Sequence, residues 1–242
     1  MAERLILVCE GPHDHAVAEA LVERILREKI EWYDGNQDQL RCWEVPLRWR
    51  EIKEKFHSTG IKMRGLPQDH GDGIAADKAI KFIDFKYNFD NKGIIHILFL
   101  RDCDGQKERY TALKNIQEKY PNRSIIIGFA IDRIEAWILA AFIPNGEKEE
   151  AALENEKKNL GFDPTYKPHE LTASHEGAKT NPKRVLEVLM TERGNNRAIY
   201  ADMMKEVKWE HLKEEKRGDN CGILAFCHEI REKLAPNFKK EV

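Results

Sequence analysis

Short apolar runs alternate along the chain with longer segments of helical periodicity. Residues 5–9, 93–100 and 124–130 are short and almost continuously apolar, as are strands buried on both faces of a parallel sheet. A weaker strand is expected within residues 39–47. Apolar residues recur at helical spacing between and after these runs, which predicts helices over residues 12–26, 74–87, 106–120 and 134–142.

This order of elements predicts an α/β fold. The expected architecture is Rossmann-like, with a mainly parallel four-stranded sheet and helices on both faces. After Pro144 the pattern changes to long charged segments without a convincing strand, and helices are predicted at residues 181–190 and 222–234. The first of these has Asn181 as N-cap and Pro182 at its first position. We therefore expect an α/β domain over residues 1–145 and a mainly helical region over residues 146–242.

Length and composition limit the classes of protein to consider. With 242 residues and 41% hydrophobic composition, the chain suffices for one sizeable core and a smaller appended unit. No run approaches the roughly 18 apolar residues of a membrane span, and the first residues enter a strand directly, so we expect a cytoplasmic protein without a membrane partner. The five cysteines are scattered without CxxC spacing, which argues against a disulfide framework or a zinc ribbon.

The charge balance argues against binding of polyanions by bulk charge. The formal net charge is -2 and the pI is near 6.5, so any contact with nucleic acid must be local. Residues 41–64 are the best candidate, because seven basic residues stand there against three acidic ones, with Trp43, Trp49 and Phe56 between them. A solvated charged surface with core tryptophans explains this segment equally well.

Acidic residues follow two of the predicted strands directly. Glu10 comes after the first strand, and Asp102 and Asp104 come after residues 93–100, one residue apart, so they share a side if the strand continues. Asp14 stands four residues after Glu10. Ligands bind beyond the carboxyl ends of parallel strands, and clustered carboxylates raise their own pKa values or attract a dication, Mg²⁺ or Mn²⁺ for oxygen ligands. The alternative is that these acids only cap helices and turns.

Three segments together resemble a known family. Residues 8–14, VCEGPHD, look like the glutamate motif of TOPRIM domains, and residues 98–105, LFLRDCDG, look like their DxD motif. Residues 131–139, IDRIEAWIL, are similar to the Glu-bearing segment of TOPRIM nucleases of the OLD and Gabija kind and of their small standalone relatives. The resemblance covers roughly residues 4–142 and implies a TOPRIM-like α/β domain.

The resemblance implies a metal-dependent endonuclease that nicks or cleaves DNA phosphodiesters. Two Mg²⁺ or Mn²⁺ ions are implied, with Glu10 also serving as general acid or base. The family also uses a lysine after the Glu segment. Lys179 and Lys183 are candidates, and Lys183 is the better one because it stands at a predicted helix start. The implied site residues are Glu10, Asp102 and Asp104 for the first ion, Asp14 and Glu135 for the second, and Lys183 as a catalytic lysine.

The resemblance also bears on partners. It implies nucleic acid as substrate, DNA rather than RNA, and a role in phage defence or DNA processing. OLD-type proteins carry a fused ATPase that this sequence lacks, so any ATPase partner is a separate chain. Cleavage of both strands of a duplex needs two active sites, which favours a homodimer.

Two other function classes stay open. Residues 102–105, DCDG, also resemble the nucleophile motif of haloacid-dehalogenase (HAD)-like phosphatases, although that family places the motif on its first strand and has Thr or Val where Gln106 stands. The second of these classes is a non-catalytic TOPRIM-like module that binds nucleic acid or a partner. The presence of the full carboxylate set argues against this class. His13, His15 and His70 are expected to be polar surface residues rather than ligands. Cys221, Cys227 and Trp137 are expected in the core.

Overall fold

The computed structural model describes residues 3–33, 43–62, 71–87 and 94–238. The strands are β1 (Arg4–Cys9), β2 (Leu47–Arg48), β3 (Ile95–Asp102) and β4 (Ser124–Ala130). The α-helices are α1 (Pro12–Lys29), α3 (Ile52–His57), α4 (Gly71–Tyr87), α5 (Glu108–Lys119), α6 (Ile134–Ala141), α7 (Glu147–Leu160), α8 (Pro182–Leu189), α9 (Arg197–Glu206), α10 (Trp209–Lys213), α11 (Arg217–Cys221) and α12 (Ile223–Glu229). Shorter helical turns are η1 (Trp49–Glu51), η2 (Pro168–Glu170), η3 (Glu214–Lys216), η4 (Ile230–Leu234) and η5 (Ala235–Asn237).

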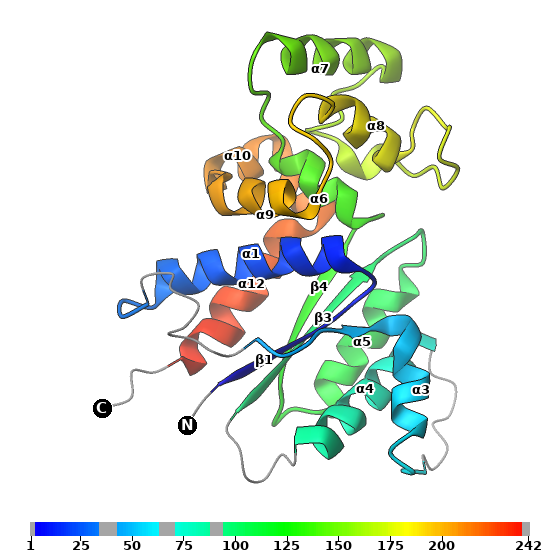
Figure 1. Ribbon diagram of the computed structural model, residues 1–242, viewed down its shortest axis with the longest axis vertical. Coiled ribbons are helices and arrows are strands. Elements are labelled where there is room, and N and C mark those ends of the chain that lie inside the picture. Colours follow the sequence, from blue (N-terminus) through cyan, green and yellow to red (C-terminus); the bar gives the residue numbers. More distant parts are fainter. Residues whose placement is uncertain (1–2, 34–42, 63–70, 88–93, 239–242) are drawn as a thin grey trace.

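The four strands form one sheet in the order β2-β1-β3-β4, and every pair is parallel. Figure 1 shows β1, β3 and β4 crossing the middle of the molecule, with helices on either side. Because all strands run in the same direction, their carboxyl ends meet at one edge. The predicted α/β class with a parallel four-stranded sheet is confirmed.

Each central strand is buried on both faces, as its continuous apolar sequence predicts. In β3, Leu98 and Leu100 join a core cluster with α1, α6, α9 and α12. Ile97 and Phe99 point the other way, into a second cluster with α4 and α5. The prediction of helices on both faces is therefore confirmed.

Some boundaries differ from the sequence-based expectations. The strand expected over residues 93–100 extends to Asp102, so the first acid of the DxD motif is part of β3. The helix expected from residue 74 begins at Gly71, three residues earlier. Of the weak strand expected at 39–47, residues 39–42 lie outside the described part, Trp43 forms a single bridge to Leu5, and β2 begins at Leu47.

The region after residue 145 is helical, as predicted, and shows no strand within the part that the structure describes. Asn181 caps α8 by accepting a hydrogen bond from the Arg184 amide, as its sequence indicates. Helices α7, α9, α10 and α11 were not predicted. The last helix, α12, packs on β4 and belongs to the same core cluster as β1, so the end of the chain completes one face of the sheet. The domain boundary near residue 145 stays a prediction.

The aromatic residues of the basic segment 41–64 belong mostly to the core. Trp49 is 9% exposed, stacks on Phe99, and donates its Nε1–H to the Leu100 carbonyl. Phe56 is also buried. A stacking platform for nucleic acid at these two aromatics is therefore wrong, and the alternative of core packing is right. Arg41 and Arg64, the ends of the segment, lie outside the described residues.

The remaining expectations about the core are confirmed. Trp137, Cys221 and Cys227 have no exposed surface, and the Trp137 Nε1–H donates to the Cys221 carbonyl. Among the described helices, none is both long and apolar enough to cross a membrane.

A buried carboxylate ties α4 to α5 and leads to a stability prediction. Asp77 has no exposed surface and accepts hydrogen bonds from Lys119 and Tyr120, while Lys81 lies 2.7 Å from its other oxygen. Burial alone would raise the pKa of Asp77, but these hydrogen bonds outweigh it and lower the pKa below its usual value.

Asp77→Ala is expected to destabilise the fold by about 2 kcal/mol at neutral pH, since hydrogen bonds to a charged group are lost. A lowered folded-state pKa stabilises the protein above the unfolded pKa, and this stabilisation is lost as pH falls through the folded pKa. Urea unfolding at pH 7 and pH 3 measures both effects. The control is Asp202→Ala, whose side chain is 68% exposed and which is expected to change stability by less than about 0.5 kcal/mol. Equal stability of the two variants at pH 7 contradicts the prediction.

Candidate functional site

Carboxylates from three strand-to-helix connections line one pocket at the carboxyl edge of the sheet. Glu10 follows β1, Asp102 ends β3, and Glu135 lies in the first turn of α6 after β4. The pocket has a volume of about 360 Å³. All six residues expected from the sequence line it: Glu10, Asp14, Asp102, Asp104, Glu135 and Lys183.

The turn between β1 and α1 holds Asp14 against the backbone. Gly11 is the N-cap and Pro12 the first helical residue, where a missing N–H costs nothing. Asp14 Oδ2 accepts hydrogen bonds of 2.9 Å from the amides of both Glu10 and Gly11. Through this oxygen Asp14 caps the start of α1, which is the alternative role considered from the sequence. Asp14 nevertheless also lines the pocket.

The turn after β3 places the second acid of the DxD motif differently from the expectation. The strand ends at Asp102, and Asp104 adopts a left-handed conformation with φ of 45°. The condition under which the two acids would share a side, a strand that continues through Asp104, is therefore not met, and Gly105, with φ of 73°, extends the left-handed turn. Both carboxylates still line the pocket, while Cys103 is buried and lines a different, apolar cavity.

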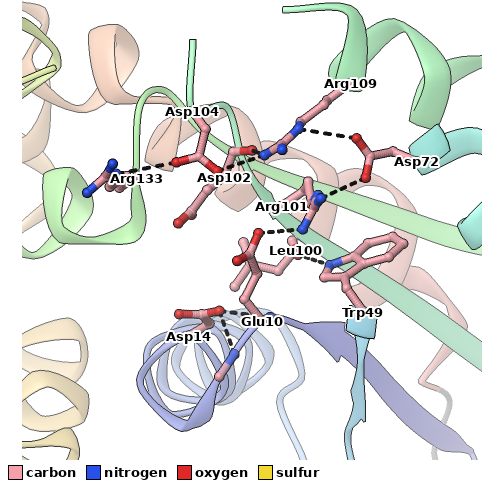
Figure 2. A network of polar contacts seen from close by, with 11 residues as sticks. Glu10, Asp14, Trp49, Asp72, Leu100, Arg101, Asp102, Asp104, Arg109 and Arg133 are labelled. Carbon is pink, nitrogen blue, oxygen red and sulfur yellow. Dashed lines mark hydrogen bonds and ion pairs between the residues drawn. The ribbon is translucent and has the colours of Figure 1, made fainter. Parts of the chain in front are cut away.

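Three arginines contact the pocket carboxylates, and sequence reasoning missed all of them. Arg101 pairs with Glu10, Arg109 Nη1 lies 2.8 Å from Asp104 Oδ2, and Arg133 Nε lies 3.3 Å from Asp104 Oδ1 (Figure 2). The sequence positions of two of these arginines could have indicated their role. Arg101 immediately precedes the DxD motif, and Arg133 stands two residues before Glu135.

A sixth carboxylate, Asp72 in the first turn of α4, joins two of these arginines. One of its oxygens lies 2.8 Å from Arg101 Nη2 and the other 3.3 Å from Arg109 Nε (Figure 2). The Arg101 guanidinium also lies 5.3 Å from the centre of the Trp49 ring. Asp72 and Trp49 thus fix the side chains that balance the charge of Glu10 and Asp104.

Electrostatic repulsion is concentrated on Asp102. Burial raises the pKa of its carboxyl well above the usual value, and the charges of Asp14, Glu135, Glu10 and Asp104 raise it further, in that order. Burial is also the largest cause of the raised pKa of Glu10, which Arg101 opposes. A cation placed among these oxygens would relieve the repulsion.

Lys183 is the lysine that reaches the pocket. It is the second residue of α8, and its Nζ lies 3.9 Å from Glu135 Oε1. Lys179 is not among the residues that line the pocket, which agrees with the choice of Lys183. His13 lines the pocket with its ring edge against Tyr200, at 5.4 Å between centroids. His15 lies outside it, and His70 belongs to the residues not described.

The donor set of the pocket is suited to a hard dication. Its acidic ligands are all carboxylate oxygens, which favour Mg²⁺ or Mn²⁺ over zinc. As the side chains stand, no three His, Cys, Asp or Glu residues of the described ranges converge closely enough to hold an ion. Glu10 and Asp104 point to arginines in this arrangement.

Comparison with known proteins gave no match: no family model, no curated protein and no solved structure is similar to this chain.

Proposed function

We propose that the chain is a metal-dependent endonuclease of TOPRIM type that hydrolyses nucleic-acid phosphodiesters. The observation that carries this proposal is the set of five carboxylates, from three strand ends, that share one pocket with Lys183. Their order along the chain follows the motifs that resemble the OLD and Gabija nucleases. The TOPRIM assignment rests on that resemblance together with the parallel sheet.

Glu10, Asp102 and Asp104 would hold one Mg²⁺ or Mn²⁺ ion, and Asp14 and Glu135 a second. When bound, such ions supply Lewis acidity and orient water for in-line attack on phosphate. To bind an ion, Glu10 must exchange its contact with Arg101, and Asp104 its contacts with Arg109 and Arg133.

In this proposal the cations around the pocket bind the phosphate of the substrate. The guanidinium groups of Arg101, Arg109 and Arg133 are shaped to bind phosphate oxygens through paired N–H groups. Lys183 adds a point charge beside Glu135. Burial raises the pKa of Glu10, and this direction suits a carboxyl that serves as general acid or base. The same arginines that neutralise the acids without substrate would then bind the phosphate.

Partners follow from the resemblance and belong to the proposal. DNA is the preferred substrate over RNA, a separate ATPase chain is the expected partner, and a homodimer would provide two sites for duplex cleavage. A role in phage defence or DNA processing is proposed on the same basis. A cytoplasmic location is proposed as well, from the sequence pattern rather than from the resemblance.

The test is a cleavage assay with purified protein on plasmid, linear duplex, single-stranded DNA and RNA, with Mg²⁺ or Mn²⁺. Wild type is expected to nick or degrade DNA, and Glu10→Gln to lose about 100-fold or more in rate, because a ligand and a proton acceptor are both removed. The matched control is Glu232→Gln, which neutralises an exposed carboxylate outside the pocket and is expected to cleave like wild type.

Other results point to other functions. If wild type does not cleave with either metal, with or without an added ATPase, the nuclease proposal is refuted. The non-catalytic module then remains as the alternative. Release of phosphate from small phosphomonoesters, without cleavage of nucleic acid, identifies the HAD-like phosphatase alternative. Equal cleavage by Glu10→Gln and wild type excludes this pocket as the reaction site.

A further inference from the structure

A second cavity, of about 490 Å³, adjoins the carboxylate pocket. The two share Gly11 and Pro12, the turn that leads from β1 into α1. From this turn the cavity continues as a groove between α1, α9 and the segment that enters β2. Its size lies within the range of about 300–1,000 Å³ typical of small-ligand sites, so it holds a group as large as a nucleotide.

Two helices form the long sides of this groove. From α1 it is lined by a stripe at helical spacing, from Pro12 through Ala16 and Glu19 to Glu23. At a rise of 1.5 Å per residue this stripe is about 16 Å long. From α9, Arg197, Ala201 and Lys205 line the groove in the same way.

The two helices run in the same direction beside each other. Arg197, at the start of α9, lies close enough to His15 to interact electrostatically, and Lys205, at its end, interacts with Glu19. The T-shaped contact between the rings of His13 and Tyr200 also joins the N-terminal parts of α1 and α9. The groove therefore begins at the turn it shares with the carboxylate pocket and leads away from it along both helices, which lie side by side in Figure 1.

Both cations and acids line the groove, the acids being Glu19 and Glu23 of α1. Arg48 of β2, Arg197 and Lys205 line the groove, and all three are substantially exposed. Arg197 forms no ion pair with an acid of the described ranges. Among the same residues, the contacts of Arg48 and Lys205 to acids of their own segments are long, 3.9 and 3.8 Å, and Lys205 also interacts electrostatically with Glu19. Such cations are available to an anion. Of the groove's acids, Glu19 lies 3.4 Å from the ring of His15, whose pKa burial lowers, and it interacts electrostatically with Lys205.

We infer that this groove binds a single nucleic-acid strand that continues from the phosphate in the carboxylate pocket. The inference rests on the proposed function and extends it with a strand path. With a net charge of -2, the chain must contact a polyanion locally, and three exposed cations beside the proposed reaction site provide such a contact. A flexible single strand can bend into a groove bounded by two helices, whereas a duplex presents a stiff convex surface.

The test measures binding without cleavage. Fluorescence anisotropy of a labelled single-stranded DNA oligonucleotide is followed in the Glu10→Gln background without added metal, at several salt concentrations. Adding Arg197→Ala and Lys205→Ala is expected to weaken binding by about 10-fold or more at low salt. It should also reduce the slope of log K against log salt by about 1.4, since each phosphate contact of a single strand contributes about 0.7.

The matched control adds Lys148→Ala and Lys158→Ala to the same background. Both lysines lie on α7, outside the groove, and removing them changes the net charge by the same amount. This control is expected to bind like its parent. Unchanged affinity and salt slope in the groove variant, or an equal loss in the control, overturns the inference, as does the absence of single-strand binding by the parent.

The two proposals fail separately. Cleavage by wild type together with unchanged binding by the groove variant refutes only the strand path. Groove-dependent binding without cleavage under any metal refutes the nuclease proposal and keeps the strand path. Circular dichroism of each variant at equal concentration excludes loss of the fold as the cause of weaker binding.

Discussion

Replacing Asp102 with asparagine is expected to abolish cleavage and, at neutral pH, to make the fold more stable. Asp102 ends β3 and lines the carboxylate pocket, where it is one of the three proposed ligands of the first ion. Metal-assisted hydrolysis is worth several kcal/mol, so losing this ligand should reduce the rate by about 10³-fold or more. The same carboxylate destabilises the folded chain, because burial and four neighbouring acids disfavour its charged form.

The sign of the pH dependence follows from the raised pKa. The folded protein binds the Asp102 proton more tightly than the unfolded chain does, so the penalty is complete above the folded-state pKa. It shrinks as pH falls and vanishes below the unfolded pKa, near 3.8. The gain in stability of Asp102→Asn over wild type should therefore grow as pH rises and disappear in acid, which is the pattern of a functional group kept at a cost in stability.

Thermal unfolding of metal-free protein between pH 4 and pH 8, beside the plasmid assay, measures both effects. A gain of a few degrees at pH 7 is expected, since each kcal/mol shifts the midpoint by about 2–4 °C in a chain of this size. Glu232→Gln serves as control and should change neither quantity. A lower midpoint for Asp102→Asn at pH 7 contradicts the repulsion, and unchanged cleavage contradicts the role of the pocket.

The sheet was predictable because its strands are buried on both faces. Residues such as Leu98 and Phe99 are adjacent in sequence yet enter opposite core clusters, so the strand must be apolar throughout. Helix α9 is short and buries only Tyr200, Met203 and Met204, and it was missed. A readable signal was present all the same, since Asn196 caps α9 by accepting hydrogen bonds from the amides of Ala198 and Ile199.

The acids of the site were predictable and their partners were not. Glu10 and Asp102 directly follow apolar runs, and a parallel sheet brings such positions together. The partner of each acid depends instead on strand register and on helix placement. Asp72 stands 29 residues before Arg101 in the sequence, and only the packing of α4 brings the two within 2.8 Å. Alternation along a strand does not apply to Asp104, because β3 ends at Asp102 and the left-handed turn begins at Asp104.

Replacing Gly222 with alanine is expected to cause the largest loss of stability, because this residue fixes the last helix against the sheet. Gly222 joins α11 to α12 with φ of 88°, and a Cβ there would lie 2.3 Å from the Phe129 carbonyl oxygen of β4. Neither backbone can yield easily, since Phe129 is part of a strand and α12 packs in the core. A left-handed conformation costs a non-glycine residue about 1–2 kcal/mol, and overpacking adds about 1–3 kcal/mol.

Gly161→Ala separates these two costs. Gly161 ends α7 with a similar φ of 84°, but no atom lies within 4 Å of its Cβ position. It should therefore lose only the conformational part, about 1–2 kcal/mol, while Gly222→Ala loses about 2–5 kcal/mol in urea unfolding. Equal losses would mean that α12 can shift away from β4. A larger loss at Gly222 means that the end of the chain is an integral part of the sheet's cover, on which the pocket at the strand ends depends.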